Sequence, residues 1–83
     1  MQFANKTFLV TGGASGLGAA CVREFAGAGA NVVICDINQP REALPAGIAA
    51  RVRFHKTDVA GEADVQAAID LAVDEFGGLH GVV

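Results

Sequence analysis

Basic residues and long apolar runs are scarce in this chain of 83 residues. Six lysines and arginines against nine acidic residues give a net charge of −3, without the basic patch that nucleic-acid binding needs. No apolar run approaches the roughly 18 residues of a membrane span. The N-terminus lacks the charged region and small-residue cleavage site of a signal peptide. We therefore expect a cytoplasmic protein with no nucleic-acid or membrane partner.

Groups that bind metals or form disulfides are also few. Cys21 and Cys35 lie 14 residues apart and form no CxxC pattern. They could form a disulfide or a metal pair, but both lie on predicted apolar faces, so we interpret them as reduced core residues. His55 and His80 have no Cys or His partner at ligand spacing, and we expect no metal site.

Hydrophobic residues make up 52% of the chain, which argues against disorder, and the length allows one small domain. Apolar runs typical of buried strands alternate with apolar residues at helical spacing. Strands are predicted at Lys6–Thr11, Asn31–Asp36, Arg51–Asp58 and Leu79–Val83. Helices are predicted over Gly16–Gly29 and Val65–Phe76, with a short, weak helix between the second and third strands, where two prolines lie.

This alternation predicts an α/β fold: the N-terminal half of a Rossmann-like, doubly wound parallel sheet with strand order 3-2-1-4. In the third strand, Val52 and Phe54 share one face and Arg53 and His55 the other, which indicates a strand near an edge. The first helix is predicted to bury an apolar stripe, made of Leu17, Ala20, Cys21, Phe25 and Ala28.

Four glycines lie within seven residues at the first strand-to-helix turn, in the stretch TGGASGLG. Ligands of open α/β sheets bind at the carboxyl ends of the strands, where this turn lies. We predict that Gly12 turns the chain, that Gly16 lets a pyrophosphate approach the backbone, and that Gly18 lets the helix pack close to the sheet. The unpaired N–H groups and the dipole of the helix suit an anion.

The glycine spacing excludes two common phosphate-binding motifs. A Walker A loop needs Lys and Ser/Thr where the chain has Ala19 and Ala20, and the spacing differs from GxGxxG. Asp36, at the end of the second strand, lies 18 residues after Gly18. An acid there can accept hydrogen bonds from the ribose hydroxyls of a dinucleotide. A solvent-facing strand end is the alternative interpretation of Asp36.

The stretch TGGASGLG resembles the TGxxxGxG signature of the classical short-chain dehydrogenases/reductases, and the resemblance covers the whole chain. In this comparison Asp36 falls at the cofactor-selecting acid, and Asp58-Val59 resembles the adenine-contacting Asp-Val pair. Asp58 has the alternative interpretation of a turn or helix-entry residue. The resemblance implies NAD as the cofactor. The residues that we expect to bind it are Gly12, Ser15, Gly16, Leu17, Gly18, Asp36, Ile37, Asp58 and Val59.

The chain departs from the family pattern in one important respect. The family uses a Tyr-x-x-x-Lys pair, a Ser and an Asn for catalysis, whereas this chain has no tyrosine and its only serine is Ser15. No residue can therefore be assigned as catalytic. We expect residues 1–83 to form an NAD-binding Rossmann half-domain, either the front of a longer protein or a truncated form that ends before the catalytic half.

The resemblance implies an oxidoreductase that transfers hydride between NAD and a secondary alcohol or carbonyl. The chain is especially similar to type-2 3-hydroxyacyl-CoA dehydrogenases. One alternative is an NADP-linked carbonyl reductase, which basic residues at positions 14 or 37 would favour, but these are Ala14 and Ile37. Another is a non-catalytic, nucleotide-binding regulatory module. We also expect a small-molecule substrate and, at full length, a homo-oligomer.

Overall fold

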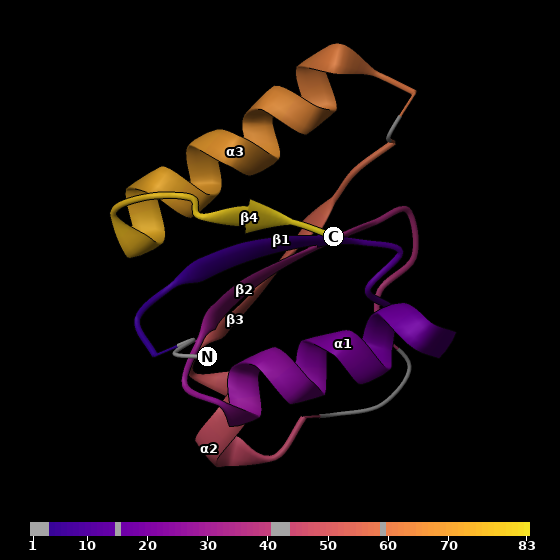
Figure 1. The fold of residues 1–83 in the computed structure, drawn as a ribbon. Coiled ribbons are helices and arrows are strands. Elements are labelled where there is room, and N and C mark those ends of the chain that lie inside the picture. The colour runs from indigo at the N-terminus through magenta and orange to yellow at the C-terminus, as the bar shows by residue number, and fades with distance from the viewer. Residues whose placement is uncertain (1–3, 15, 41–43, 59) are drawn as a thin grey trace.

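Strands and helices alternate along the chain in a computed structural model that describes residues 4–14, 16–40, 44–58 and 60–83 (Figure 1). The elements are β1 (Thr7–Thr11), α1 (Gly16–Gly27), β2 (Asn31–Asp36), α2 (Ala46–Ala49), β3 (Val52–Lys56), α3 (Glu62–Phe76) and β4 (Gly81–Val82). All neighbouring strands pair in parallel, in the order β3-β2-β1-β4. The predicted α/β class and strand order are confirmed.

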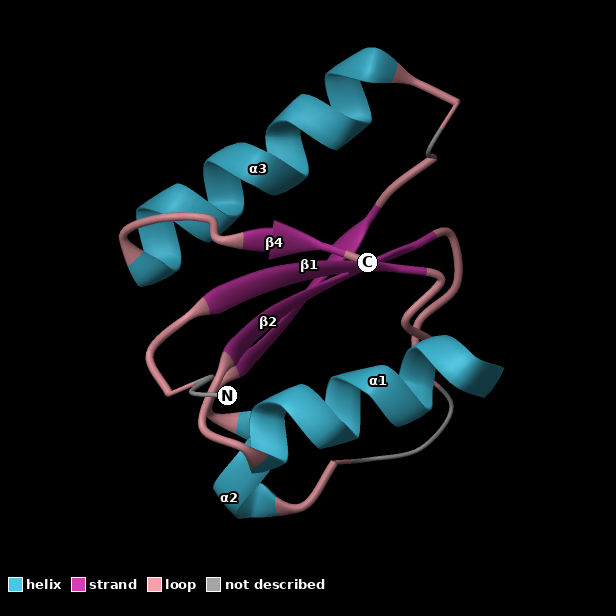
Figure 2. Cartoon of the chain, viewed as in Figure 1, coloured by secondary structure: helices cyan, strands magenta, loops and turns pink. Residues whose placement is uncertain are grey.

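The helices cover both faces of the sheet, with α1 and α2 on one face and α3 on the other (Figure 2). Right-handed crossovers explain this division. The first two crossovers run outward from β1 to β2 and β3, whereas the third returns to the far side of β1, so its helix must lie on the opposite face. The strand order therefore reverses beside β1, and in folds of this kind the ligand binds at that reversal.

The core consists of two clusters, one on each face of β1 and β2, because successive strand residues point to opposite faces. On the α1 face, α1 packs against Val10, Val32 and Ile34. On the α3 face, Leu9, Val33 and Cys35 contact α3 through small residues, Ala68 and Ala72. The two central strands are thus buried on both sides, as parallel strands usually are.

The buried stripe of α1 differs from the prediction. Val22 and Ala26 are the buried residues of this helix. Leu17 is 87% exposed, and Ala20 and Ala28 are also exposed. Small apolar residues occur on every side of this helix, so apolar spacing alone did not define its buried face. The partly buried residues that pack beside the stripe include Cys21 and Phe25, as predicted.

The two cysteines lie on opposite faces of the sheet. Cys21 packs against the cluster under α1, whereas Cys35 belongs to the cluster under α3 and is 1% exposed. Both are free thiols. The placement of Cys35 in the core, predicted from the sequence, is confirmed.

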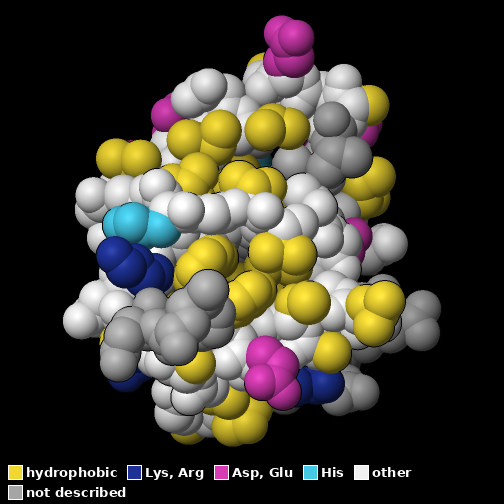
Figure 3. All heavy atoms as spheres, viewed as in Figure 1, with side chains coloured by type: hydrophobic (Ala, Val, Ile, Leu, Met, Phe, Trp, Pro, Cys, Tyr) yellow, Lys and Arg dark blue, Asp and Glu magenta, His cyan; other side chains and the backbone are white. Residues whose placement is uncertain are grey.

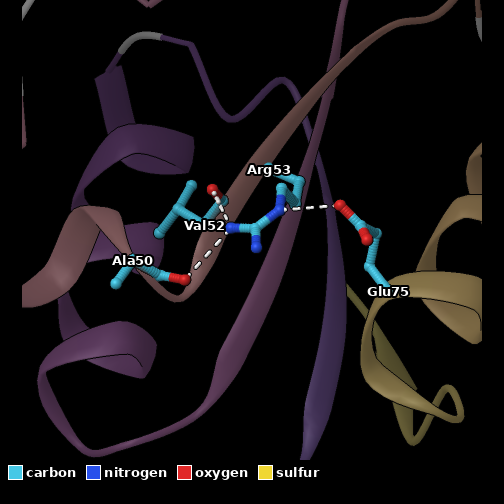
Figure 4. Close-up of polar contacts among 4 residues, drawn as sticks. All are labelled: Ala50, Val52, Arg53 and Glu75. Carbon is cyan, nitrogen blue, oxygen red and sulfur yellow. Dashed lines mark hydrogen bonds and ion pairs between the residues drawn. The ribbon is translucent and has the colours of Figure 1, made fainter.

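Arg53 anchors the edge strand β3 to the far end of α3 (Figure 4). Its Nε donates a hydrogen bond of 3.0 Å to Glu75, and its guanidinium lies 5.2 Å from the centre of the Phe76 ring. Its Nη1 donates to the backbone carbonyls of Ala50 and Val52. Exposed ion pairs contribute little alone, but here one planar group joins an edge strand, a turn and a helix.

The other edge of the sheet, β4, is shorter than predicted and ends in exposed valines. Val82 is 63% exposed and Val83 is 50% exposed. Hydrophobic side chains gather across the middle of the face shown in Figure 3, where Figure 1 places β4 and β1 between α3 and α1. An apolar strand edge readily pairs with another strand.

No helix within the described residues is both long enough and apolar enough to cross a membrane.

A histidine side chain extends the pairing of β4 toward its start. The backbone N–H of His80 donates to the carbonyl of Thr7 at 2.8 Å, and the N–H of Thr7 donates to Nδ1 of His80 at 2.9 Å. The imidazole thus takes the place of a backbone carbonyl beside β1. This explains why His80 is attached to the sheet although β4 begins at Gly81.

We predict that replacing His80 with leucine lowers the free energy of unfolding by about 1 kcal/mol, because the Thr7 N–H loses its acceptor. His80→Asn is the matched control, since its amide oxygen can occupy the position of Nδ1. Urea denaturation of the complete protein measures both variants. Equal midpoints for wild type and His80→Leu would show that the imidazole bond does not stabilise the sheet.

Candidate functional site

The loop between β1 and α1 turns through two glycines with left-handed backbone geometry. Gly12 has φ +67° and Gly16 has φ +61°. Residues with a Cβ are rarely stable there, so the backbone itself requires glycine at both positions. The predicted role of Gly12 in the turn agrees with this geometry. At Gly16 the turn is a reason for glycine in addition to the predicted approach of a pyrophosphate. Ser15 lies outside the described residues.

The other two glycines of the loop allow close packing. A Cβ on Gly18 would overlap the carbonyl oxygen of Gly12 and lie 3.0 Å from the Cα of Gly13. The start of α1 therefore rests directly on the loop, which refines the predicted contact between helix and sheet. A Cβ on Gly13 would lie 2.9 Å from a methyl group of Ile34. Sequence reasoning assigned Gly13 no role, because its requirement comes from the neighbouring strand.

The described part of the loop leaves space at two of its glycines. A Cβ added to Gly12 or Gly16 would meet no heavy atom of the described residues within 4 Å, their chain neighbours aside. The first turn of α1 carries no acidic side chain. Its first backbone N–H groups have no partner within the helix, and the positive end of the helix dipole lies there. The loop and helix start thus offer room and positive potential to an anionic group, with the exposed side chain of Leu17 beside it.

Asp36 is bonded to this loop. Its Oδ2 accepts a hydrogen bond of 3.1 Å from the N–H of Ala14, and its Oδ1 accepts one of 3.0 Å from the N–H of Asn38. A carboxylate has about four acceptor positions, so about two remain beside the bonds from the described residues. Asp36 is therefore more than a solvent-facing strand end, because it joins the end of β2 to the glycine loop. Ile37, the next residue, is 57% exposed.

Asp58 forms the turn that leads into α3. Its carboxylate accepts a hydrogen bond of 3.0 Å from the N–H of Ala60, and its carbonyl accepts one of 2.8 Å from Gly61. Its own N–H donates to Asp64 at 3.0 Å. These bonds support the helix-entry interpretation, and the adenine contact stays a prediction. Val59 lies outside the described residues.

Hydrogen bonds link the ends of all four strands into one continuous edge. The N–H of Gly12 donates to the carbonyl of Cys35, and the N–H of Thr57 donates to the carbonyl of Asp36, both at 2.9 Å. The hydroxyl of Thr11 donates to the carbonyl of Val83, also at 2.9 Å. This edge brings the glycine loop, Asp36 and the start of the α3 turn together, as expected for parallel strands that end at the same side.

Two buried side chains lie beneath this edge. Burial raises the pKa of the Cys35 thiol, and a hydrogen bond with Thr57 opposes that rise. Since the pKa is raised, the group is a neutral thiol at pH 7 and a poor nucleophile. Thr57 is 2% exposed, and sequence reasoning did not single it out.

Within the described residues, no group of His, Cys, Asp or Glu side chains could hold a metal ion.

Residues 6–83 match the family described as short chain dehydrogenase. This chain belongs to that family. A solved structure of a short-chain dehydrogenase/reductase from Sinorhizobium meliloti 1021 is similar to this chain. Its TM-score against this chain is 0.80, and the sequence identity is 32%. The similarity covers 99% of this chain and 40% of that protein.

The curated relatives of this chain include dehydrogenases and a sex determination protein. A 2,5-dichloro-2,5-cyclohexadiene-1,4-diol dehydrogenase of Sphingobium indicum is 40% identical over 96% of this chain and 32% of its own length. The sex determination protein tasselseed-2 of Zea mays is 47% identical over 88% of this chain and 22% of its length. A 3-alpha-(or 20-beta)-hydroxysteroid dehydrogenase of Mycobacterium tuberculosis is 44% identical over 94% of this chain and 30% of its own length. The chain thus spans about a third or less of these relatives.

We predict that Gly18→Ala destabilises the protein by about 1–3 kcal/mol and weakens dinucleotide binding, because the new methyl group forces α1 away from the loop. Gly27→Ala is the control, since the same helix has open space at Gly27. Alanine there should leave stability unchanged or raise it by up to about 1 kcal/mol. Thermal unfolding and NADH titration measure both variants. Equal stability of the two would show that the contact at Gly18 is not limiting.

Proposed function

We propose that this chain is the NAD-binding half-domain of an oxidoreductase that transfers hydride between NAD and a secondary alcohol or carbonyl carbon. The observation that carries the proposal is the carboxylate of Asp36, which is bonded to the glycine loop through Ala14 and whose bonds within the described part of the chain leave about two acceptor positions. The two ribose hydroxyls of NAD beside Asp36 would need about two hydrogen-bond acceptors. The bound NAD would supply the hydride acceptor, and the protein would orient it.

The same loop would hold the cofactor's pyrophosphate. The open sides of Gly12 and Gly16 leave the backbone accessible, and the N–H groups at the start of α1 can donate to phosphate oxygens. Leu17 and Ile37, both exposed apolar residues, flank this path and would contact the cofactor. Asp58 has acceptor capacity beyond its bond to Ala60, which supports its role at the adenine. We extend this role to Ser15 and Val59 by the sequence resemblance alone.

Charge supports NAD over NADP. A 2′-phosphate would lie beside the Asp36 carboxylate, and two unit charges 4 Å apart repel by about 4 kcal/mol at an effective dielectric of 20. Solvent and salt reduce this to about 2–3 kcal/mol, a preference of roughly 30- to 200-fold. Ala14 and Ile37 bring no compensating positive charge. Arg41, the nearest basic residue after Asp36 in the sequence, lies outside the described residues.

The catalytic acid–base groups would come from residues outside positions 1–83, because these contain no tyrosine and only one serine. Two relatives carry names of dehydrogenases for a diol and for hydroxysteroids, which supports a secondary alcohol as the substrate class. A 3-hydroxyacyl-CoA is a narrower hypothesis that rests on the sequence resemblance. We also propose a cytoplasmic location and a homo-oligomer for the complete protein.

The proposal predicts that the complete protein reduces NAD in the presence of a secondary alcohol, whereas residues 1–83 alone do not. The absorbance of the reduced nicotinamide measures the reaction for both polypeptides. NADH binding without turnover on any of a panel of alcohols and hydroxyacyl thioesters would instead favour the nucleotide-binding regulatory module. Turnover by residues 1–83 alone would show that the assignment of the catalytic groups is wrong.

A second prediction concerns Asp36→Ala. It should narrow the preference for NAD over NADP, mainly by raising kcat/KM for NADP, because the repulsive charge is gone. It should also cost about 1–3 kcal/mol of stability, since the buried N–H of Ala14 loses its acceptor. Asp74→Ala, which removes an exposed carboxylate from α3, is the charge-matched control. A wild type that uses both cofactors equally would place Asp36 away from the ribose.

A further inference from the structure

Thr57 is a buried polar residue that the proposed cofactor contacts do not use. It follows β3 directly and precedes Asp58, and it is 2% exposed. Its backbone N–H donates to the carbonyl of Asp36 at 2.9 Å. Thr57 therefore lies between the two carboxylates that we assign to the adenosine half of the cofactor, and its side chain points to the opposite, α3 face of the sheet, with Cys35 and His55.

The hydroxyl of Thr57 makes two hydrogen bonds to His55. It donates to the carbonyl of His55 at 2.9 Å and lies 2.8 Å from Nδ1 of the same histidine. Because the hydroxyl proton is used toward the carbonyl, the consistent arrangement has Nδ1–H of His55 donating to the oxygen. Cys35, the residue paired with His55 on the neighbouring strand, lies on the same face of the sheet. The hydroxyl thus ties Thr57 back to the end of β3, and the backbone N–H of Thr57 joins that end to β2 beneath the site.

A second threonine offers a contrast within the same fold. Thr7, at the opposite end of the sheet and on the same face, is 0% exposed, and its hydroxyl has no hydrogen-bond partner in the described part of the chain. A buried hydroxyl without a partner is unfavourable, whereas a fully bonded one holds its neighbours in place. Removal of the Thr7 hydroxyl should therefore leave the structure unchanged, whereas removal of the Thr57 hydroxyl should break its bonds to His55.

We propose that Thr57 is a positioning residue of the cofactor site: its buried hydroxyl, bonded to His55, fixes the end of β3, and its backbone N–H holds that end against Asp36, so that Asp36 and Asp58 face the adenosine together. This inference rests on the proposed function. Thr57 does not touch the cofactor. Its effect is transmitted through the backbone bond to Asp36 and through the chain continuing into Asp58, so it acts on the adenosine half and leaves the nicotinamide half alone.

The test compares Thr57→Val, Thr57→Ser and Thr7→Val in the complete protein. The readout is displacement of bound NADH by AMP and by nicotinamide mononucleotide, with circular dichroism to verify folding. Thr57→Val should weaken AMP about tenfold, equivalent to about 1.4 kcal/mol, and leave nicotinamide mononucleotide unchanged. Thr57→Ser, which keeps the hydroxyl, should restore AMP binding to within about threefold of wild type. Thr7→Val should change neither.

Three results would overturn the inference. They are unchanged AMP binding in Thr57→Val, equal weakening of both mononucleotides, and a serine variant that behaves like valine. Equal weakening would indicate a general loss of structure, which Thr7→Val controls for. A wild-type protein that binds no NADH would instead refute the proposed function, and this outcome is seen before any variant is made.

Discussion

The close approach of α1 to the glycine loop is the constraint on which the rest of the structure depends. The helix can begin directly on the loop only because Gly18 has no side chain to meet the Gly12 carbonyl, and the loop can lie on β2 only because Gly13 has none to meet Ile34. This arrangement brings the N–H of Ala14 within 3.1 Å of Asp36 and directs the helix N-terminus at the edge of the sheet. The fold and the proposed anion site therefore have the same origin.

Asp36 combines two demands that can conflict. Its hydrogen bonds to Ala14 and Asn38 stabilise the cofactor-free loop, and its remaining acceptor positions would select the cofactor. A residue with both roles cannot be changed for specificity alone, because its removal leaves a buried N–H without a partner. Change of cofactor preference at this position therefore calls for a replacement side chain that still accepts a hydrogen bond from the loop.

The sequence predicted the strand order and most elements, because buried parallel strands have continuous apolar runs that few other structures share. It did not predict which side of α1 is buried, since alanine and glycine occur all around that helix and Leu17 lies exposed at its start. It located Asp36 through its spacing from the glycines. Gly13 and Thr57 were not singled out, because their contacts with neighbouring residues of the sheet leave no periodic pattern in the chain.

The carboxyl edge of the sheet behaves as one bonded unit. Gly12 is linked to Cys35, Asp36 to Thr57, and Asp58 to the start of α3. The opposite edge has a different arrangement, in which Thr7 leaves its hydroxyl unpaired and pairs its N–H with the imidazole of His80. The carboxyl edge is thus held by a continuous series of bonds beneath the acceptor positions and helix N–H groups that a ligand would use, whereas the opposite edge holds a buried hydroxyl without a partner among the described residues. This difference is expected if the edge beside the glycine loop is organised for binding, because a preorganised site reduces the ordering cost of its ligand.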